Sequence, residues 1–164
     1  MSEKTESEAP LSLYPEYRIK DKAMSFQLPS KLFIWDSADE STLFLASEPS
    51  ENSNDISTQL FITKEEVEWN DRLEPYIAGF LDYIRENAKG YEDEKVNYVT
   101  IDGQRLAKVE YSAFIGNQRM SILQCFVIFQ SHAYMIDCKC LYENKVFWKE
   151  EFDNLIESLL FYKD

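Results

Sequence analysis

The segment from Val96 to Cys140 most constrains the fold, because it is broken only by very short polar connectors. These connectors are Asp102-Gly103, Gly116-Asn117 and Ser131-His132, and apolar residues fill most of the chain between them. Two strands that are joined by so few residues must run antiparallel, since a parallel connection needs a long crossover. The sequence therefore predicts an antiparallel meander of four strands.

The last hairpin of this meander sets a register. If Gln130 and Ala133 flank a two-residue turn, one strand places apolar residues opposite those of the next. These opposed sets are Phe129, Val127, Cys125 and Leu123 against Tyr134, Ile136, Cys138 and Cys140. The register predicts one continuous buried face.

The preceding hairpin is expected to contain an odd-length loop or a bulge. A strict two-residue loop at Gly116-Asn117 would pair Leu123 with Glu110, whereas one extra residue places Tyr111 opposite Leu123 and Val109 opposite Cys125. Val96 and Tyr98 then join the same face. The predicted core face consists of Val109, Tyr111, Cys125, Val127, Ile136 and Cys138.

The second face of the meander is also rich in apolar residues, more than a face in water usually is. The candidate partner-binding residues lie there: Leu106, Phe114, Met120, Ile122, Phe126, Ile128 and Met135. Two interpretations remain open. Either a helix or the segment 31–35 covers this face, or the face is an open groove for an apolar partner.

Three strands are predicted before the meander, at Met24 to Leu28, Thr42 to Ser47 and Thr58 to Thr63. A helix from Asp71 to Lys89 follows, with Asp71 and Glu74 as a capping box and Gly90 as its stop. A second helix follows Asn144, and its apolar stripe is Trp148, Phe152, Leu155, Ile156 and Leu159. Phe152 and Leu155 should meet the core face. The fold class is α+β: an antiparallel sheet of six to seven strands, ordered three strands, helix, four strands, helix.

Composition bounds the classes of protein to which this chain can belong. Its 164 residues fit one domain, expected at 13–164 behind a flexible acidic leader at 1–12. The formal net charge of −13 argues against nucleic acid and anionic lipid as ligands. No apolar run is long enough to span a bilayer. Reduced thiols are the default state of the three cysteines, and a cytoplasmic location is expected.

Residues that could carry catalysis are scarce. His132 is the only histidine, no GxSxG elbow accompanies it, and the four glycines are too far apart for a phosphate-binding loop. The sequence therefore predicts no metal site, no cofactor and no enzymatic activity, and a protein-binding module is the favoured class. The alternative is a small-molecule-binding protein or an enzyme that uses carboxylates in a cleft.

Several phrases, in order along the chain, resemble the PsbP-like superfamily, which includes the Ran-binding Mog proteins and the DcrB-like bacterial proteins. They are Met24 to Pro29 (MSFQLP), Trp35, a strand ending near Thr63, a helix holding Tyr76 to Ile84, Ile101-Asp102-Gly103-Gln104, and Phe152 to Leu160. This resemblance implies a Mog/PsbP-like α/β sandwich.

A second resemblance concerns Trp35-Asp36, Ser41 to Leu45, Leu60 to Thr63 and the helix that follows. This part is similar to the Eag-type chaperones of type VI secretion effectors. Those chaperones are non-catalytic, often dimeric, and shield hydrophobic segments of a cargo protein on a sheet surface. The resemblance implies a cytoplasmic adaptor or chaperone with a hydrophobic effector segment as its protein partner, and a homodimer over the same face is the alternative.

Overall fold

The computed structural model describes residues 16–35, 39–49, 58–68 and 70–163. The leader expected at 1–12 lies outside these residues. The described elements are β1 (Glu16–Arg18), β2 (Met24–Gln27), β3 (Phe33–Ile34), β4 (Thr42–Ser47), β5 (Gln59–Glu66), α2 (Leu73–Asn87), β6 (Glu92–Ile101), β7 (Gln104–Ile115), β8 (Gln118–Phe129), β9 (His132–Leu141), the 3-10 helix η1 (Tyr142–Asn144), α3 (Lys145–Glu157) and β10 (Leu160–Phe161).

The strands form two antiparallel sheets. The larger has the order β3-β4-β5-β9-β8-β7-β6, and the smaller has the order β1-β2-β10. The α+β class and the meander of β6 to β9 are confirmed. After β5 the chain passes through α2 to β6 at the far edge of the large sheet. The meander β6 to β9 then runs back across the sheet, and its last strand, β9, pairs with β5.

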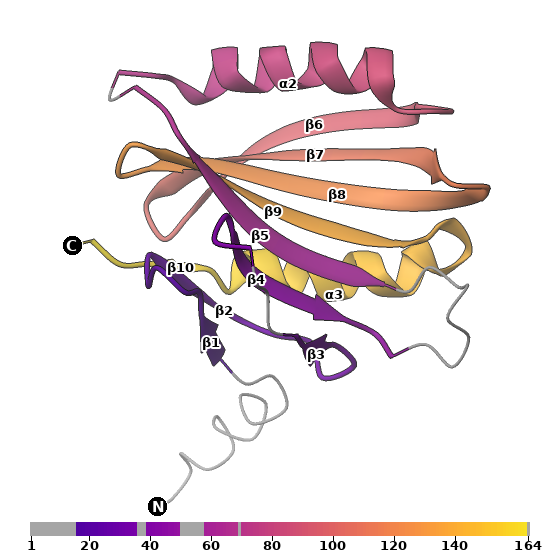
Figure 1. The fold of residues 1–164 in the computed structure, drawn as a ribbon, viewed down its shortest axis with the longest axis horizontal. Coiled ribbons are helices and arrows are strands. Elements are labelled where there is room, and N and C mark those ends of the chain that lie inside the picture. The colour runs from indigo at the N-terminus through magenta and orange to yellow at the C-terminus, as the bar shows by residue number, and fades with distance from the viewer. Residues whose placement is uncertain (1–15, 36–38, 50–57, 69, 164) are drawn as a thin grey trace, which may run out of the picture.

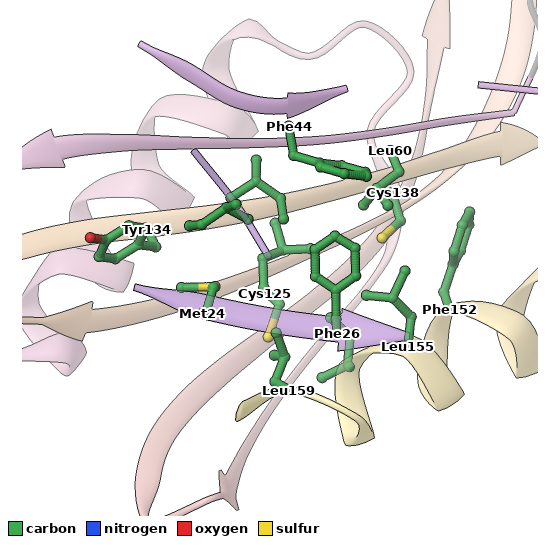
Figure 2. Close-up of a cluster of buried hydrophobic side chains, with 14 of the residues drawn as sticks. Met24, Phe26, Phe44, Leu60, Cys125, Tyr134, Cys138, Phe152, Leu155 and Leu159 are labelled. Atoms are coloured by element: carbon green, nitrogen blue, oxygen red, sulfur yellow. The ribbon is translucent and has the colours of Figure 1, made fainter. Parts of the chain in front are cut away.

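The helices lie on opposite faces of the seven-stranded sheet. α2 covers one face, while α3 and the small sheet lie on the other (Figure 1). The core between α3, the small sheet and the large sheet contains Cys125, Cys138, Phe152 and Leu155 (Figure 2). These cysteines and helix residues therefore meet on one face, as predicted.

The β8–β9 turn is one residue earlier than expected. Gln130 and Ser131 both have positive φ, 52° and 64°, which is the geometry of a tight primed hairpin turn. Phe129 consequently pairs with His132, and Cys125 with Ile136 rather than with Cys138. Because a shift of two residues preserves the side-chain alternation, the residues of β8 and β9 stay on their predicted faces.

The bulge predicted in the β7–β8 hairpin is wrong. Ile115 pairs with Gln118 around a strict two-residue loop, so Glu110 lies opposite Leu123. This one-residue difference turns Val109 and Tyr111 toward α2, away from Cys125. Glu110 is tolerated on the α3 side because Lys149 Nζ lies 3.2 Å from its Oε1.

Both helices form where the sequence predicts them, but the predicted capping box of α2 does not. Asp71 does not cap α2: its Oδ2 accepts a hydrogen bond from the Glu68 backbone N–H, and the N-cap is Arg72 without a side-chain bond. The stripe of α3 is buried as predicted. The sequence does not predict β1, β3 and β10, since two or three residues are too few for a periodic signal.

Candidate functional site

The seven candidate partner-binding residues do not share one face. Met120, Ile122, Phe126, Ile128 and Met135 belong to the α2 side of the sheet, whereas Leu106 packs in the core on the α3 side. Phe114 lies an even number of residues after Leu106 in β7, so strand alternation places it on the α3 side as well. The cause is the strict β7–β8 loop, which pairs Ala107 with Phe126 and so turns its neighbour Leu106 the other way.

α2 covers the centre of the face for which the sequence leaves two interpretations. Met120, Ile122 and Phe126 are buried, and the Phe126 ring lies 4.6 Å from that of Phe80 and 6.1 Å from that of Tyr76. The interpretation in which a helix of the same chain covers this face is therefore correct for these three residues. In this structure they offer no surface to a partner.

The remaining part of the same face is less well covered. α2 packs on β7 and β8, and in the described ranges no other helix lies on this face, whose strands also include β3, β4, β5 and β9 (Figure 1). Two aromatic side chains there are strongly exposed, Phe33 at 57% and Trp35 at 54%. We call this surface the apolar shelf and define it by Phe33, Trp35, Leu45, Phe61, Ile128 and Met135; the last four are half-buried.

Strand pairing places the shelf residues in rows. Trp35 donates its backbone N–H to Leu45 O, Leu45 pairs with Phe61, and Phe61 pairs with Asp137. Met135 lies two residues from Asp137, on the same face of β9. The Trp35 indole also donates to Ser47 Oγ at 2.6 Å, which orients the ring. The shelf is thus a continuation of the face under α2.

A buried polar group borders the shelf. Asp137 is 2% exposed and its Oδ2 accepts a hydrogen bond from Gln124 Nε2 at 3.0 Å. The Tyr111 hydroxyl in turn donates to Gln124 Oε1 at 2.8 Å. Lys139 Nζ lies 3.4 Å from Asp137 Oδ2 and 4.5 Å from the centroid of the Phe61 ring. Burial raises the pKa of Asp137, although Lys139 and Gln124 oppose that change.

One edge of the shelf is formed by aromatic residues of α2. The Tyr76 hydroxyl donates a hydrogen bond to Glu65 of β5, so this side of the helix faces the shelf. Tyr83, two turns after Tyr76, falls on the same side and is 63% exposed.

The shelf is wide enough for a helix. Adjacent strands are about 4.8 Å apart, so the four strands β3, β4, β5 and β9 span roughly 14 Å, which exceeds the about 10 Å diameter of a helix.

A carboxylate stands at one end of the shelf. Glu65, near the end of β5, is exposed and lies on the same face of the strand as Phe61, whereas Glu66 and Glu48 fall on the α3 face, where Glu48 contributes to the raised pKa of Cys140. A basic residue of a binding partner would meet opposite charge at the Glu65 end.

The part of the chain that the structure describes carries neither a metal-binding cluster nor a membrane-spanning helix. Among these residues, no group of three or more His, Cys, Asp or Glu side chains is placed to hold a metal ion. No helix in the same ranges is both long and apolar enough to cross a membrane.

Comparison with known proteins identifies the fold of the chain. No family model matches the sequence, and no curated protein matches it either. Among solved structures, the chain is similar to a cyanobacterial PsbP from Synechocystis, with a TM-score of 0.67 and 13% identity over 93% of this chain and 94% of that one. The chain is also similar to LpqN, a protein involved in cell envelope biogenesis of Mycobacterium tuberculosis.

The similarity to LpqN has a TM-score of 0.70 and 10% identity over 91% of both chains. A mutant of the protein Mog1 matches with a TM-score of 0.60 and 7% identity, over 90% of this chain and 95% of that one. These structures share one architecture. The chain therefore has the PsbP/Mog1-like fold, as the sequence resemblance implied.

Proposed function

We propose that this protein is a non-catalytic protein-binding module, an adaptor or chaperone that holds an apolar helix of a partner on the apolar shelf. The observation that supports this function is a helix-wide, partly exposed apolar surface that continues the face already occupied by α2. α2 contributes Leu73, Ile77 and Leu81 to the packing on its half of the face. A partner helix would complete the same layer on the other half.

The energetics permit such a complex. Removal of roughly 500 Å² of apolar surface from water contributes on the order of 12 kcal/mol before association costs. Phe33 and Trp35 are exposed aromatic residues of the type that dominates the binding energy of protein interfaces. We therefore expect micromolar or tighter binding.

Charge favours one occupant over another. The chain carries a net charge of −13, so a second copy of the same chain would bring like charge to Glu65. A foreign apolar helix with Lys or Arg at its ends would instead be attracted. We therefore favour a basic-flanked apolar helix over a homodimer, and this choice retains the hydrophobic effector segment that the Eag-type resemblance implies. A cytoplasmic location and a role in secretion are parts of the same proposal.

A synthetic peptide tests the proposal directly. We suggest a helix of about 18 Leu and Ala residues, which is about 27 Å long, with two lysines at each end. Binding is measured by fluorescence anisotropy of a labelled peptide and by tryptophan emission, which should shift as Trp35 leaves water. Phe33→Asp should weaken binding about tenfold or more, since it places a charge against the apolar helix.

Leu160→Asp is the matched control, because Leu160 is exposed on β10 in the small sheet. It should leave peptide binding unchanged. A glutamate-flanked peptide of the same core should bind more weakly than the lysine-flanked one. The proposal is wrong if the lysine-flanked peptide does not bind, or if folded Phe33→Asp binds it as well as the unchanged protein. A concentration-dependent dimer that Phe33→Asp abolishes would instead assign the shelf to a second copy.

A further inference from the structure

A cavity of about 320 Å³ lies on the opposite side of the sheet from the apolar shelf. It is bounded by α3 as far as Phe152, by η1 and by β6, β7, β8 and β9. Its apolar lining includes the buried side chains of Leu123, Cys140 and Phe152. The volume falls at the lower end of the range for small-molecule sites, and the mixture of an apolar interior with a few polar groups is typical of them.

The acidic groups on its wall already have basic partners. Glu110 Oε1 lies 3.2 Å from Lys149 Nζ, and Asp93 Oδ2 lies 3.3 Å from an Arg119 guanidinium nitrogen. Each of these cations is shared with a second carboxylate, Lys149 with Asp153 at 3.2 Å and Arg119 with Glu92 at 2.7 Å. Neither cation is therefore free to pair with an anionic ligand.

Lys145 differs from these groups. Its Nζ donates a hydrogen bond to the Tyr142 hydroxyl at 2.7 Å and lies 3.9 Å from the centroid of that ring. Within the described ranges no carboxylate forms a salt bridge with it, so its partners there are neutral. Tyr142 itself is flanked by the Arg119 guanidinium, 4.6 Å from the ring centroid. The charge on the cavity wall that lacks an ionic partner is therefore positive.

We propose that this cavity binds a small amphipathic carboxylate, with the carboxylate on the Lys145 ammonium and the apolar body against Leu123, Cys140 and Phe152. Partial burial makes such an ion pair stronger than one in bulk water, because the surroundings screen it less. The apolar body supplies the remaining affinity. This site lies on the other face of the sheet and is independent of the proposed function.

Octanoate is the probe. We expect saturable binding in isothermal titration calorimetry with a Kd below about 1 mM, and about tenfold weaker binding of 1-octanol, which has the same chain without the charge. In NMR spectra the shifted resonances should be those of Leu123, Phe152 and their neighbours. Added salt should weaken the binding of octanoate more than that of octanol.

Two variants test the assignment of the site. Lys145→Gln removes the charge and should weaken octanoate binding about tenfold while the affinity for octanol is unchanged. Ser121→Phe places a ring in the cavity and should abolish the binding of both, and its melting curve shows whether it is folded. Lys95→Gln, an exposed lysine of β6 outside the lining, is the matched control and should bind as the unchanged protein does. Absence of octanoate binding to the unchanged protein, equal affinity for octanol, or full binding by Lys145→Gln would each overturn the proposal.

Discussion

Gln124 Nε2 donates a hydrogen bond to Asp137 Oδ2 at 3.0 Å across neighbouring strands, and both residues are buried on the α2 face. The Gln124 carbonyl is in turn occupied by Tyr111, so the amide orientation is determined from both sides. This polar pair lies between Tyr111, which packs with the α2 side of the core, and Phe61 of the apolar shelf. The position of a carboxylate in such surroundings gives the first prediction.

Asp137→Asn should raise the free energy of unfolding at pH 7, on the order of 1 kcal/mol. Burial raises the pKa of Asp137 above its ordinary 3.8, so its ionised form is disfavoured in the folded state. The resulting cost is absent below the unfolded pKa and grows as pH rises through the folded pKa. Urea unfolding of both proteins between about pH 3 and 7 should show the difference growing with pH. A difference that is constant or shrinks with pH would contradict this account.

Asp153 should behave in the opposite sense. Burial acts to raise its pKa, but the hydrogen bond from Lys108 at 2.9 Å and the charges of Lys108 and Lys149 lower it overall. The stability that this ionised group contributes is present above pH 3.8 and is lost as pH falls through the lower folded pKa.

Asp153→Ala should therefore cost about 1 to 2 kcal/mol at pH 7, because it leaves the largely buried Lys108 without its partner. Lys149→Ala, which removes a more exposed lysine, should cost less than about 1 kcal/mol. Urea titrations at neutral pH and near pH 3 measure both values. An Asp153→Ala cost that persists undiminished at the lowest pH would exclude the ionic explanation.

Two glycines should respond oppositely to alanine. Gly90 has φ +67°, and a Cβ there would lie 2.5 Å from Phe114 Cδ2, so Gly90→Ala should lower stability by about 1 to 2 kcal/mol. Gly79 lies inside α2 and is exposed, and no atom lies within 4 Å of the place that a Cβ would take. Gly79→Ala should raise stability by about 0.5 to 1 kcal/mol. Thermal unfolding of the two variants measures both changes in stability. A change of the same sign in both variants would refute the backbone argument.

Neighbouring positions on the α2 face should differ in their tolerance of charge. Phe126→Asp buries a carboxylate beneath Tyr76 and Phe80 and should destabilise the protein by more than about 3 kcal/mol. Ile128→Asp, at a half-buried shelf position, should cost clearly less, because water reaches the new group. Denaturant unfolding gives both values, and hydrogen exchange should show early opening of α2 in Phe126→Asp. Equal costs would mean that α2 does not provide the cover.

The thiols should be inert in the native protein. Burial raises the pKa of Cys125 to about 12 and that of Cys140 to about 11, and it raises that of Cys138 as well. Since the thiolate is the reactive form, a thiol reagent at about pH 8 should react at the rate of unfolding, with Cys140 first because it borders the cavity. Rapid labelling of Cys125 or Cys138 (Figure 2) would contradict the packing.

Local patterns in the sequence determined the longer strands, both helices and one of the two core faces. The alternation of Cys125, Val127, Ile136 and Cys138 predicted their common burial against α3, and a shift of two residues in the β8–β9 register did not change it. The apolar stripe of α3 could be predicted equally well, because helical and strand periodicities depend only on residues close in the chain.

Tertiary structure alone decided which side of the sheet received Val109 and Tyr111. That outcome depended on the length of one hairpin loop and on Lys149, far along the chain, which offsets the charge of Glu110. The apolar shelf could not be predicted from the sequence either, since it combines β3, β4, β5 and β9 with the side of α2 that faces them. Local sequence specifies which residues avoid water, but the element that covers them is chosen by packing between segments that are distant in the chain.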